Sequence, residues 1–379
     1  MKKRIMIVAG EASGDLHGSN LVKAALRLDP ELAFIGIGGP RMRQEGVNVL
    51  VDASAMAVVG LVEVISHAGV IHKAFTLLKR IIRTDPPDLL ILIDYPDFNL
   101  MLAGVARKAG VKVLYYISPQ VWAWRVGRVK KIARLVDRMA VVFPFEVPFY
   151  EKERVPVEFV GHPLVDTVRP ILSVAEAHRA FGTDPARRTI GLFPGSRKEE
   201  VRVHLPLILE SAAILKGRFP DLQFILLLAS TLDRSGVETH LGACEVPVTV
   251  VAEKGYDVMQ VCDAAISVSG TVTLELALMG VPMVIIYRVS PLTYLIGKRL
   301  VRVDNIGLCN IVAGERVVQE LIQSDASPER ISDEITRIIT EPCCSETMKS
   351  KYMKMRDILG GGGCSEKVAE IISEMIRDK

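Results

Sequence analysis

A chain of 379 residues is long for one domain and leaves room for two of about 150–200 residues each. Hydrophobic residues make up 49% of the chain, so each half can bury a core of its own. The longest apolar run, 272–287, is interrupted by Glu275 and Pro282 and is shorter than the roughly 20 residues that a membrane-spanning helix needs. We therefore expect no spanning helix.

Cysteine use and the N-terminus bear on where the protein works. The six cysteines all follow residue 243 and none stands in a Cys-x-x-Cys pair, a distribution that fits neither a disulfide framework nor a zinc site. The apolar run after Met1 ends at Glu11 and is too short for the core of a signal peptide. We expect a reduced, cytoplasmic protein.

The net charge of +3 is unevenly distributed. Residues 1–166 carry 22 Lys and Arg against 17 Asp and Glu, a balance of +5, whereas the remainder carries 25 against 27, a balance of −2. A basic first half suits an anionic acceptor or an anionic membrane surface, although a slightly basic solvated face explains the charge equally well.

Short apolar runs alternate with helical patterns along the chain, which is typical of parallel sheets with crossover helices. In the first half we expect strands at 4–8, 33–37, 89–93, 112–116 and 139–142, with helices at 16–28, 70–83, 98–108 and 126–136. In the second half we expect strands at 189–193, 223–228, 248–251, 264–268 and 283–286, again with helices between them.

A stretch containing Gly and Pro, 161–166, separates the two series as a linker. The sequence therefore predicts an α/β fold with one nucleotide-fold domain at 1–166, a second at 167–346, and a helical tail at 347–379. Ligands of such sheets bind beyond the carboxyl ends of the strands, so we expect the active site in the cleft between the domains.

Two motifs of the first half stand where a strand ends. Gly10-Glu11-Ala12-Ser13-Gly14-Asp15 opens a helix, where glycines and a helix N-terminus favour an anion; a tight turn with Asp15 as the helix cap is the alternative. Asp94 and Asp97 follow the strand at 89–93. Asp97 is placed to cap the next helix, which leaves Asp94 at the strand tip as a general base or as a turn-forming residue before proline.

The second half repeats the loop-to-helix pattern twice. Gly195-Ser196-Arg197 follows its first strand, and the arginine can make paired hydrogen bonds to a diphosphate. Ser269-Gly270-Thr271 follows the strand at 264–268, and Glu275 lies one helical turn further on. Because like charges repel, Glu275 suits ribose hydroxyls better than phosphate. Each motif alone is also explained by an ordinary capped helix, but together they predict a nucleotide site.

No Asp-x-Asp pair occurs in the chain. Sugar transferases of one common architecture use that pair to hold a divalent metal ion on the donor diphosphate. We therefore expect neither a metal nor a cofactor, and we expect helix N-termini and Arg197 to neutralise the leaving group.

Two segments of the first half favour a lipid. Residues 56–83 are largely apolar and collect four basic residues towards their end, as in an interfacial helix. Both tryptophans, Trp122 and Trp124, precede a basic stretch that extends to Arg138, as at a lipid headgroup boundary. The same stretch would suit nucleic acid, but no recognised nucleic-acid-binding motif accompanies it, so we expect no nucleic acid. Core packing is the alternative for each single apolar residue.

Taken together, these segments resemble the lipid-A-disaccharide synthase family. The matching stretches follow the family's order over nearly the whole chain: 9–15, 93–99, 118–124 (Ser-Pro-Gln-Val-Trp-Ala-Trp), 161–163 (Gly-His-Pro), 194–197, 269–275 and 305–310 (Asn-Ile-Gly-Leu-Cys-Asn). The resemblance implies a GT-B fold, in which two Rossmann-like lobes face each other across a cleft and the C-terminal tail crosses back onto the first lobe.

The resemblance also implies the reaction. The 6-hydroxyl of lipid X, a 2,3-diacylglucosamine 1-phosphate, attacks the anomeric carbon of UDP-2,3-diacylglucosamine. This inverting transfer gives a β-1,6-linked disaccharide 1-phosphate and UDP on the way to lipopolysaccharide. The protein is then expected to be peripheral on the cytoplasmic face of the inner membrane. Its oligomeric state stays open, a homodimer being one option.

On this interpretation the first lobe binds the acceptor, the second lobe binds the donor, and Asp94 is the general base. The donor residues are Gly195, Ser196, Arg197, Ser269, Gly270, Thr271, Glu275, Asn310 and Gln323, and the acceptor residues are Glu11, Ser13, Gly14, Asp15, Asn99 and Trp122.

Two other interpretations stay open. Another GT-B enzyme, such as a UDP-N-acetylglucosamine 2-epimerase or a transferase acting on polyprenyl-linked muropeptide, would share the nucleotide site, but an epimerase needs no apolar acceptor segment. A non-catalytic nucleotide-sugar sensor at the membrane would bind UDP and release no product, and the placement of Asp94 argues against it.

Overall fold

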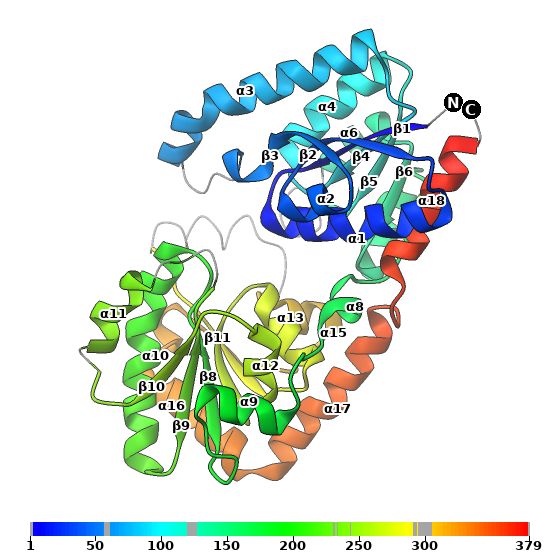
Figure 1. Ribbon diagram of the computed structural model, residues 1–379. Coiled ribbons are helices and arrows are strands. Elements are labelled where there is room, and N and C mark those ends of the chain that lie inside the picture. Colours follow the sequence, from blue (N-terminus) through cyan, green and yellow to red (C-terminus); the bar gives the residue numbers. More distant parts are fainter. Residues whose placement is uncertain are drawn as a thin grey trace. The chain divides into compact units, whose positions relative to one another are not determined.

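The computed structural model describes residues 3–56, 61–119, 127–229, 232, 234–242, 244–290, 294 and 305–377. It divides into two compact units (Figure 1). The first unit comprises Met1–Asp166 together with Leu359–Lys379, and the second comprises Thr167–Ile358. The last stretch of the chain therefore belongs to the unit in which the chain begins.

The first unit is built on a seven-stranded sheet with the order β3-β2-β1-β4-β5-β6-β7, in which all strand pairs are parallel. Its strands are β1 Arg4–Ala9, β2 Ala33–Gly38, β3 Asn48–Asp52, β4 Leu89–Ile93, β5 Lys112–Tyr116, β6 Arg138–Val141 and β7 Val157–Phe159. Its helices are α1 Ala12–Leu28, α2 Pro40–Gln44, η1 Ala53–Ala55, α3 Leu61–Thr84, α4 Pro96–Lys108, α6 Arg128–Leu135, η2 Pro144–Glu146, α7 Val147–Glu151, α8 Leu164–Thr167 at the junction, and α18 Cys364–Arg377.

The central strands explain why this sheet needs helices on both faces. Every residue of β4 is fully buried and apolar, as are residues 5–9 of β1. Such continuous apolar runs are typical of parallel strands covered on both sides. Leu78 of α3, Leu102 of α4 and Ile132 of α6 pack into one core with these strands.

The second unit is built on a six-stranded parallel sheet with the order β10-β9-β8-β11-β12-β13. Its strands are β8 Thr189–Phe193, β9 Gln223–Leu227, β10 Val248–Val251, β11 Ala264–Val268, β12 Met283–Tyr287 and β13 Glu320–Ile322. Its helices are α9 Val174–Phe181, α10 Lys198–Arg218, α11 Ser235–Gly242, α12 Gly255–Gln260, α13 Thr271–Leu278, α15 Leu308–Ala313, η3 Gln323–Asp325, α16 Pro328–Thr340 and α17 Pro342–Ile358.

Each sheet has one point at which the strand order reverses. In the first unit the reversal lies between β1 and β4, where Ala9 pairs with Ile93, and in the second it lies between β8 and β11, where Phe193 pairs with Ser267. At such a point two neighbouring loops leave the sheet in opposite directions, and the crevice beyond the carboxyl ends of the strands is a ligand site in open α/β sheets. These two loop pairs are therefore the places to look for chemistry.

All ten expected strands are present, with bounds that agree to within one residue. Three further strands, β3, β7 and β13, were not expected. Each lies at an edge of its sheet, and β7 and β13 are only three residues long. An edge strand is only partly buried and therefore lacks the apolar run that marks a central strand.

The C-terminal tail begins later than expected. Residues 342–358 form one continuous helix, α17, which contacts α13, α15 and α16 and belongs to the second unit. The expected boundary at residue 347 is therefore wrong, because it would cut this helix. Only the segment from Leu359 onward returns to the first unit, where α18 packs against α1.

Hydrogen bonds from the linker 161–166 hold the segment after Leu359 on the first unit. The backbone N–H of His162 donates to the carbonyl of Leu359 at 2.8 Å. The carboxylate of Asp166 accepts from the N–H groups of Gly363 and Cys364, at 2.8 and 3.1 Å, and so caps the start of α18.

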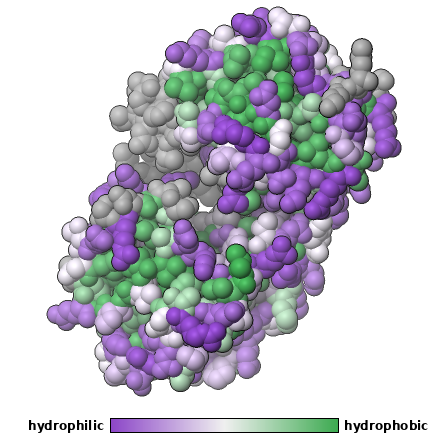
Figure 2. Space-filling model, viewed as in Figure 1, coloured by the Kyte–Doolittle hydropathy of each residue, from purple (hydrophilic) through white to green (hydrophobic). Residues whose placement is uncertain are grey.

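The described surface is apolar in places but holds no membrane span. No helix among the described residues combines the length and apolar character that crossing a bilayer requires. Figure 2 shows hydrophobic surface gathered over α3 and α4 of the first unit. Val70 on α3 is 37% exposed and Met101 on α4 is 50% exposed.

Candidate active site

The strand reversal of the second unit opens into a pocket of ≈ 330 Å³. The loops after β8 and β11 form its walls, with Phe193 and Val268 at the strand ends. Seven of the nine residues predicted to bind a donor line it: Gly195, Ser196, Arg197, Ser269, Gly270, Thr271 and Glu275.

Glu200, which the sequence motifs did not single out, already occupies part of the first loop. Its Oε2 accepts from the backbone N–H groups of Ser196 and Arg197, at 3.0 and 3.3 Å, and its Oε1 lies 3.0 Å from the guanidinium of Arg197. Gly195 has a φ of 107°, and a Cβ there would lie 2.7 Å from Oε2 of Glu200, so the close approach requires glycine. Arg197 at the cap position and Glu200 three residues later have the spacing of a capping box, a pattern that is visible in the sequence.

The second loop, after β11, leads into a helix whose first turn contains no acidic side chain. The helix α13 begins at Thr271, has no acidic residue in its first turn and has no side-chain cap hydrogen bond. Thr271 is exposed in the pocket. The hydroxyl of Ser269 donates to the carbonyl of Ile306 at 2.9 Å, which fixes the loop from behind. The positive end of the α13 dipole therefore faces the pocket, and no carboxylate in the first turn of the helix neutralises it.

Glu275 lies one turn into α13 and is half-buried at the pocket wall. Its Oε1 accepts from the hydroxyl of Tyr256 at 3.0 Å. Burial raises the pKa of Glu275, and the Tyr256 hydrogen bond opposes that rise. An acceptor-only carboxylate in this position is suited to hydroxyl groups of a ligand.

The side chain of Asn310 bonds to the chain itself. It is fully buried, its amide nitrogen donates to the carbonyl of Val318 at 2.8 Å and to Glu320 at 2.7 Å, and its Oδ1 accepts from the N–H groups of Val317 and Val318, both at 2.9 Å. These four hydrogen bonds use every donor and acceptor position of the side chain. Asn310 therefore holds the segment before β13 in place, and its predicted contact with the donor stays a prediction.

Gln323 also bonds to the chain itself. Its side chain exchanges two hydrogen bonds with the backbone of Val289, at 2.8 and 3.0 Å. The backbone carbonyl of Gln323 accepts from the guanidinium of Arg288 at 3.1 Å. Gln323 therefore fastens the segment that follows β12, and it does not line the pocket described above.

In the first unit the strand reversal brings together the Gly10 loop and Asp94. A Cβ on Gly10 would lie 2.5 Å from the ring of Tyr95, so this glycine is required by the close approach of the ring. Glu11 and Ser13 are exposed, and Gly14 packs against Ala9. The loop thus presents Glu11 and Ser13 outward, whereas its glycines serve packing.

Asp94 has an unusual backbone and an unusual carboxyl group. Asp94 and Tyr95 both have a φ of 45°, in the left-handed region that non-glycine residues avoid. Burial raises the pKa of Asp94 to about 6, with a further contribution from the negative charge of Glu11. A carboxyl group with such a pKa is half-ionised near pH 6 and can take up a proton at neutral pH.

Two predicted acceptor residues are held inside the first unit. Asp15 is buried, and its carboxylate accepts from the N–H groups of Gly39, Arg41 and Met42 at 2.6, 3.0 and 3.1 Å. It therefore caps α2, not α1, and the predicted acceptor contact of Asp15 stays a prediction. Asn99 is fully buried, and its amide donates to the carbonyls that end β4. The predicted acceptor contact of Asn99 likewise stays a prediction.

The prediction that Asp97 caps α4 is wrong. The helix starts at Pro96 and its cap position is Tyr95, so Asp97 lies in the first turn. The Asp97 side chain is 80% exposed and pairs with Arg128. Trp122 lies outside the residues that the structure describes, so its predicted acceptor contact stays a prediction.

Two histidines near this edge of the first sheet are neutral. Burial lowers the pKa of His17 to about 4 and that of His162 to about 3, and His17 adds to the lowering at His162. The His162 ring lies 4.9 Å from that of Phe143, centre to centre. Such rings act as packed, neutral side chains at physiological pH.

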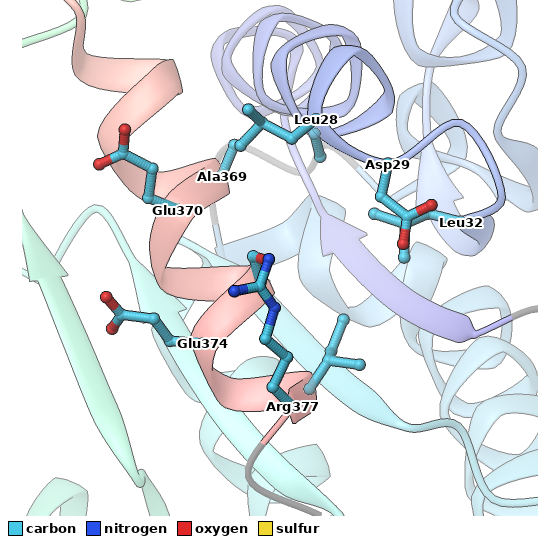
Figure 3. A pocket seen from close by; sticks show the side chains of 10 residues that line it. Leu28, Asp29, Leu32, Ala369, Glu370, Glu374 and Arg377 are labelled. Carbon is cyan, nitrogen blue, oxygen red and sulfur yellow. The ribbon is translucent and has the colours of Figure 1, made fainter.

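A larger pocket of ≈ 510 Å³ lies elsewhere in the first unit, between α1 and α18 (Figure 3). Leu28, Asp29 and Arg377 line it. These residues end α1 and α18, and α1 leads into the first residue of β2 there, so the pocket lies at the amino ends of the strands. That is the opposite edge from Asp94, where α/β sheets do not bind their ligands. No group of three or more metal-ligating side chains comes together within the described part of the chain.

Comparisons with known proteins show the family of this chain. The family model of "Lipid-A-disaccharide synthetase" matches residues 5–372. The lipid-A-disaccharide synthase of Geobacter metallireducens is 67% identical over 377 residues, covering 100% of this chain and 98% of the relative. That of Geobacter sulfurreducens is 66% identical over 373 residues, covering 98% and 97%.

Among solved structures, UDP-GlcNAc 2-epimerase from Neisseria meningitidis bound to UDP-GlcNAc matches with a TM-score of 0.66 and 14% identity, covering 98% of this chain and all of the epimerase chain. At that identity the likeness shows the fold alone. The expected GT-B class, with two Rossmann-like units and a C-terminal helix returning to the first, is confirmed. The chain belongs to the lipid-A-disaccharide synthase family, the glycosyltransferases of lipid A biosynthesis.

Proposed function

We propose that this protein transfers 2,3-diacylglucosamine from UDP to the 6-hydroxyl of lipid X, giving the β-1,6-linked disaccharide 1-phosphate and UDP. The observation that carries the proposal is that the two strand reversals hold different chemical groups. One has a pocket with an arginine, an uncapped helix start and a half-buried carboxylate; the other has Asp94 with its raised pKa.

The donor nucleotide is assigned to the pocket of the second unit. The start of α13 suits the diphosphate because its first turn carries no acidic residue, and Arg197, with a side chain 61% exposed, supplies a positive charge from the facing loop. Glu275 accepts hydrogen bonds from the ribose hydroxyls, one turn further along the same helix. Charge that develops on the departing UDP is then stabilised by groups already in position.

Asp94 is assigned as the general base. An α-linked UDP-sugar that gives a β-linked product reacts with inversion, in one in-line step. The bond from the acceptor oxygen to the anomeric carbon forms as the bond from that carbon to the diphosphate breaks, and the proton of the acceptor hydroxyl passes to Asp94. The electron pair of the broken carbon–oxygen bond leaves with UDP. One base suffices, and a pKa of about 6 leaves most of the carboxyl groups ionised at neutral pH.

The experiment is a turnover assay with UDP-2,3-diacylglucosamine and lipid X, read by mass spectrometry. The expected products are UDP and the disaccharide 1-phosphate in equal amounts. UDP-N-acetylglucosamine alone serves as the control, because a 2-epimerase would convert it to its C2 epimer. Product from the control, or UDP binding without any turnover of the two acylated substrates, would contradict the proposal.

We further propose that the first unit works as a peripheral protein at the inner face of the cytoplasmic membrane, where both acylated substrates reside. Support comes from the exposed apolar side chains of Val70 on α3 and Met101 on α4. The basic residues Lys73, Arg80 and Arg83, also on α3, suit an anionic surface. The predicted interfacial segment 56–83 is only partly described, because 57–60 and the side chains of 61–68 lie outside the described residues.

The membrane proposal is tested by flotation with anionic vesicles. Val70→Ser combined with Met101→Ser is expected to shift protein from the vesicle fraction to the soluble one, and high salt is expected to do so in part. Ile171→Ser is the matched control, since Ile171 is an 85% exposed apolar residue of the second unit. Wild-type protein that stays off the vesicles at low salt would contradict the proposal.

A further inference from the structure

The backbone at Asp94 is held in place by two side chains that converge on one atom. The carbonyl oxygen of Asp94 accepts from the hydroxyl of Tyr115 at 2.6 Å and from the amide of Asn99 at 2.7 Å. The same Asn99 amide donates to the carbonyl of Ile93 at 3.2 Å. The N–H of Asp94 donates to the carbonyl of Tyr116 at 3.3 Å. Both polar groups of the Asp94 backbone are therefore fastened to β5 or α4.

This fastening coincides with strain. Asp94 and Tyr95 are consecutive non-glycine residues with φ of 45°. Such a residue is strained and persists only where its surroundings impose its conformation. Without the two donors we expect the turn to relax, so that the Asp94 side chain leaves the end of β4 in another direction.

We propose that Tyr115, acting with Asn99, is a positioning residue that holds the left-handed turn at Asp94 and thereby aims its carboxylate at the acceptor hydroxyl. The inference rests on the proposed function, in which Asp94 is the base. Tyr115 does not touch substrate, because it is fully buried in the core of the first unit, paired on β5 opposite Leu92 of β4. It acts through the carbonyl of Asp94.

Tyr115 is suited to this role because it stays a donor. Burial raises the pKa of Tyr115 well above its ordinary value, and the negative charge of Asp94 adds to the rise. The phenol therefore keeps its proton at every pH at which the protein works. The charged group that faces Asp94 is Glu11, from the start of α1.

The test compares Tyr115→Phe with Tyr150→Phe. Tyr150 is an equally buried tyrosine of the same core, but its hydroxyl bonds to that of Ser118 at 2.6 Å and not to Asp94. Both changes remove one oxygen atom from the core. Tyr115→Phe is expected to lower kcat by about three- to tenfold, the loss that one hydrogen bond carries, with KM for both substrates unchanged. Tyr150→Phe is expected to leave kcat unchanged.

The acid limb of the pH profile of kcat separates positioning from stability. Where the Asp94 turn relaxes towards solvent, the pKa of its carboxyl falls, so the limb of Tyr115→Phe is expected to move to lower pH. The limb of Tyr150→Phe is expected to stay in place. A wild-type kcat and an unmoved limb in Tyr115→Phe would overturn the proposal, as would equal effects of the two changes. If Tyr115→Phe does not fold, Asn99→Leu removes the other donor and is judged by the same two measures.

Asp94→Asn separates this proposal from the one on which it rests. In that background Tyr115→Phe is expected to cause no further loss of kcat, because the carboxylate that it positions is gone. Full activity of Asp94→Asn would remove the base itself and so overturn the proposed function. An inactive Asp94→Asn together with a wild-type Tyr115→Phe would overturn only the role of Tyr115.

Discussion

The carboxylate of Glu200 lies 3.0 Å from the guanidinium of Arg197, and its other oxygen accepts from two backbone N–H groups at the start of α10. The pair brings opposite charges to the wall of the proposed donor pocket. The arginine side chain is 61% exposed and that of the glutamate 17%, so an incoming anion meets the arginine first. Arg197 is expected to attract the diphosphate, and Glu200 to oppose it.

Arg197→Ala is expected to raise the barrier to transfer by about 2–4 kcal/mol, because a charge already in position beside the departing UDP is lost. The measure is kcat/KM for the donor. Arg202→Ala is the matched control: Arg202 lies on α10, just after the cap residue Arg197, in an exposed pair with Glu199, and does not line the pocket. Wild-type turnover and UDP affinity in Arg197→Ala would show that the diphosphate binds elsewhere.

Glu200→Gln is expected to tighten UDP binding by about three- to tenfold, because an amide oxygen still accepts from the N–H groups while the negative charge is removed. Calorimetric titration with UDP measures the change, and Glu199→Gln, an exposed acid one residue away, is the control. Weaker binding in Glu200→Gln would mean that the carboxylate serves to hold Arg197 in position and does not compete with the ligand.

Glu275 is expected to select the ribose. The wild-type protein should bind UDP more tightly than 2′-deoxy-UDP, and Glu275→Ala should reduce that preference by about ten- to hundredfold, the value of a hydrogen bond to a charged group. Tyr256→Phe leaves the carboxylate in place but removes the hydroxyl that donates to it at 3.0 Å, so its preference for UDP should persist. Equal loss for both nucleotides in Glu275→Ala would place Glu275 away from the ribose.

The sequence predicted the central strands and the loops at both strand reversals, because buried parallel strands and Gly-containing loops have recognisable local patterns. It missed the edge strands β3, β7 and β13. It did not predict which polar side chains stay free. Asn310 and Asp15 stand in motif positions, yet their partners are N–H groups at 317–318 and 39–42, which the fold brings to them. Glu200 carried a capping-box spacing, but only the structure places its carboxylate on the loop assigned to an anion.

The two acids that follow β4 are expected to differ in activity. Asp94→Asn keeps shape and removes the basic site, so kcat should fall by roughly 10²–10⁴. Asp97→Asn should cost much less, because Asp97 is largely exposed and pairs with Arg128 at the surface. Single-turnover rates of both purified variants measure the difference. An inactive, folded Asp97→Asn beside an active Asp94→Asn would reverse the assignment.

Asp94→Asn is also expected to stabilise the protein, in a pH-dependent way. In the folded state the pKa of Asp94 is about 6, raised from an ordinary value of 3.8, so the folded state binds the proton more tightly than the unfolded state does. Ionised Asp94 therefore lowers the free energy of unfolding as the pH rises from about 4 to about 6, and the full loss is present above that window. Asparagine removes this loss. The melting temperature of Asp94→Asn should exceed that of the wild type at pH 8, and the difference should shrink towards pH 5. Asp97→Asn is the control, and a difference that is constant or grows as the pH falls would contradict a raised pKa at Asp94.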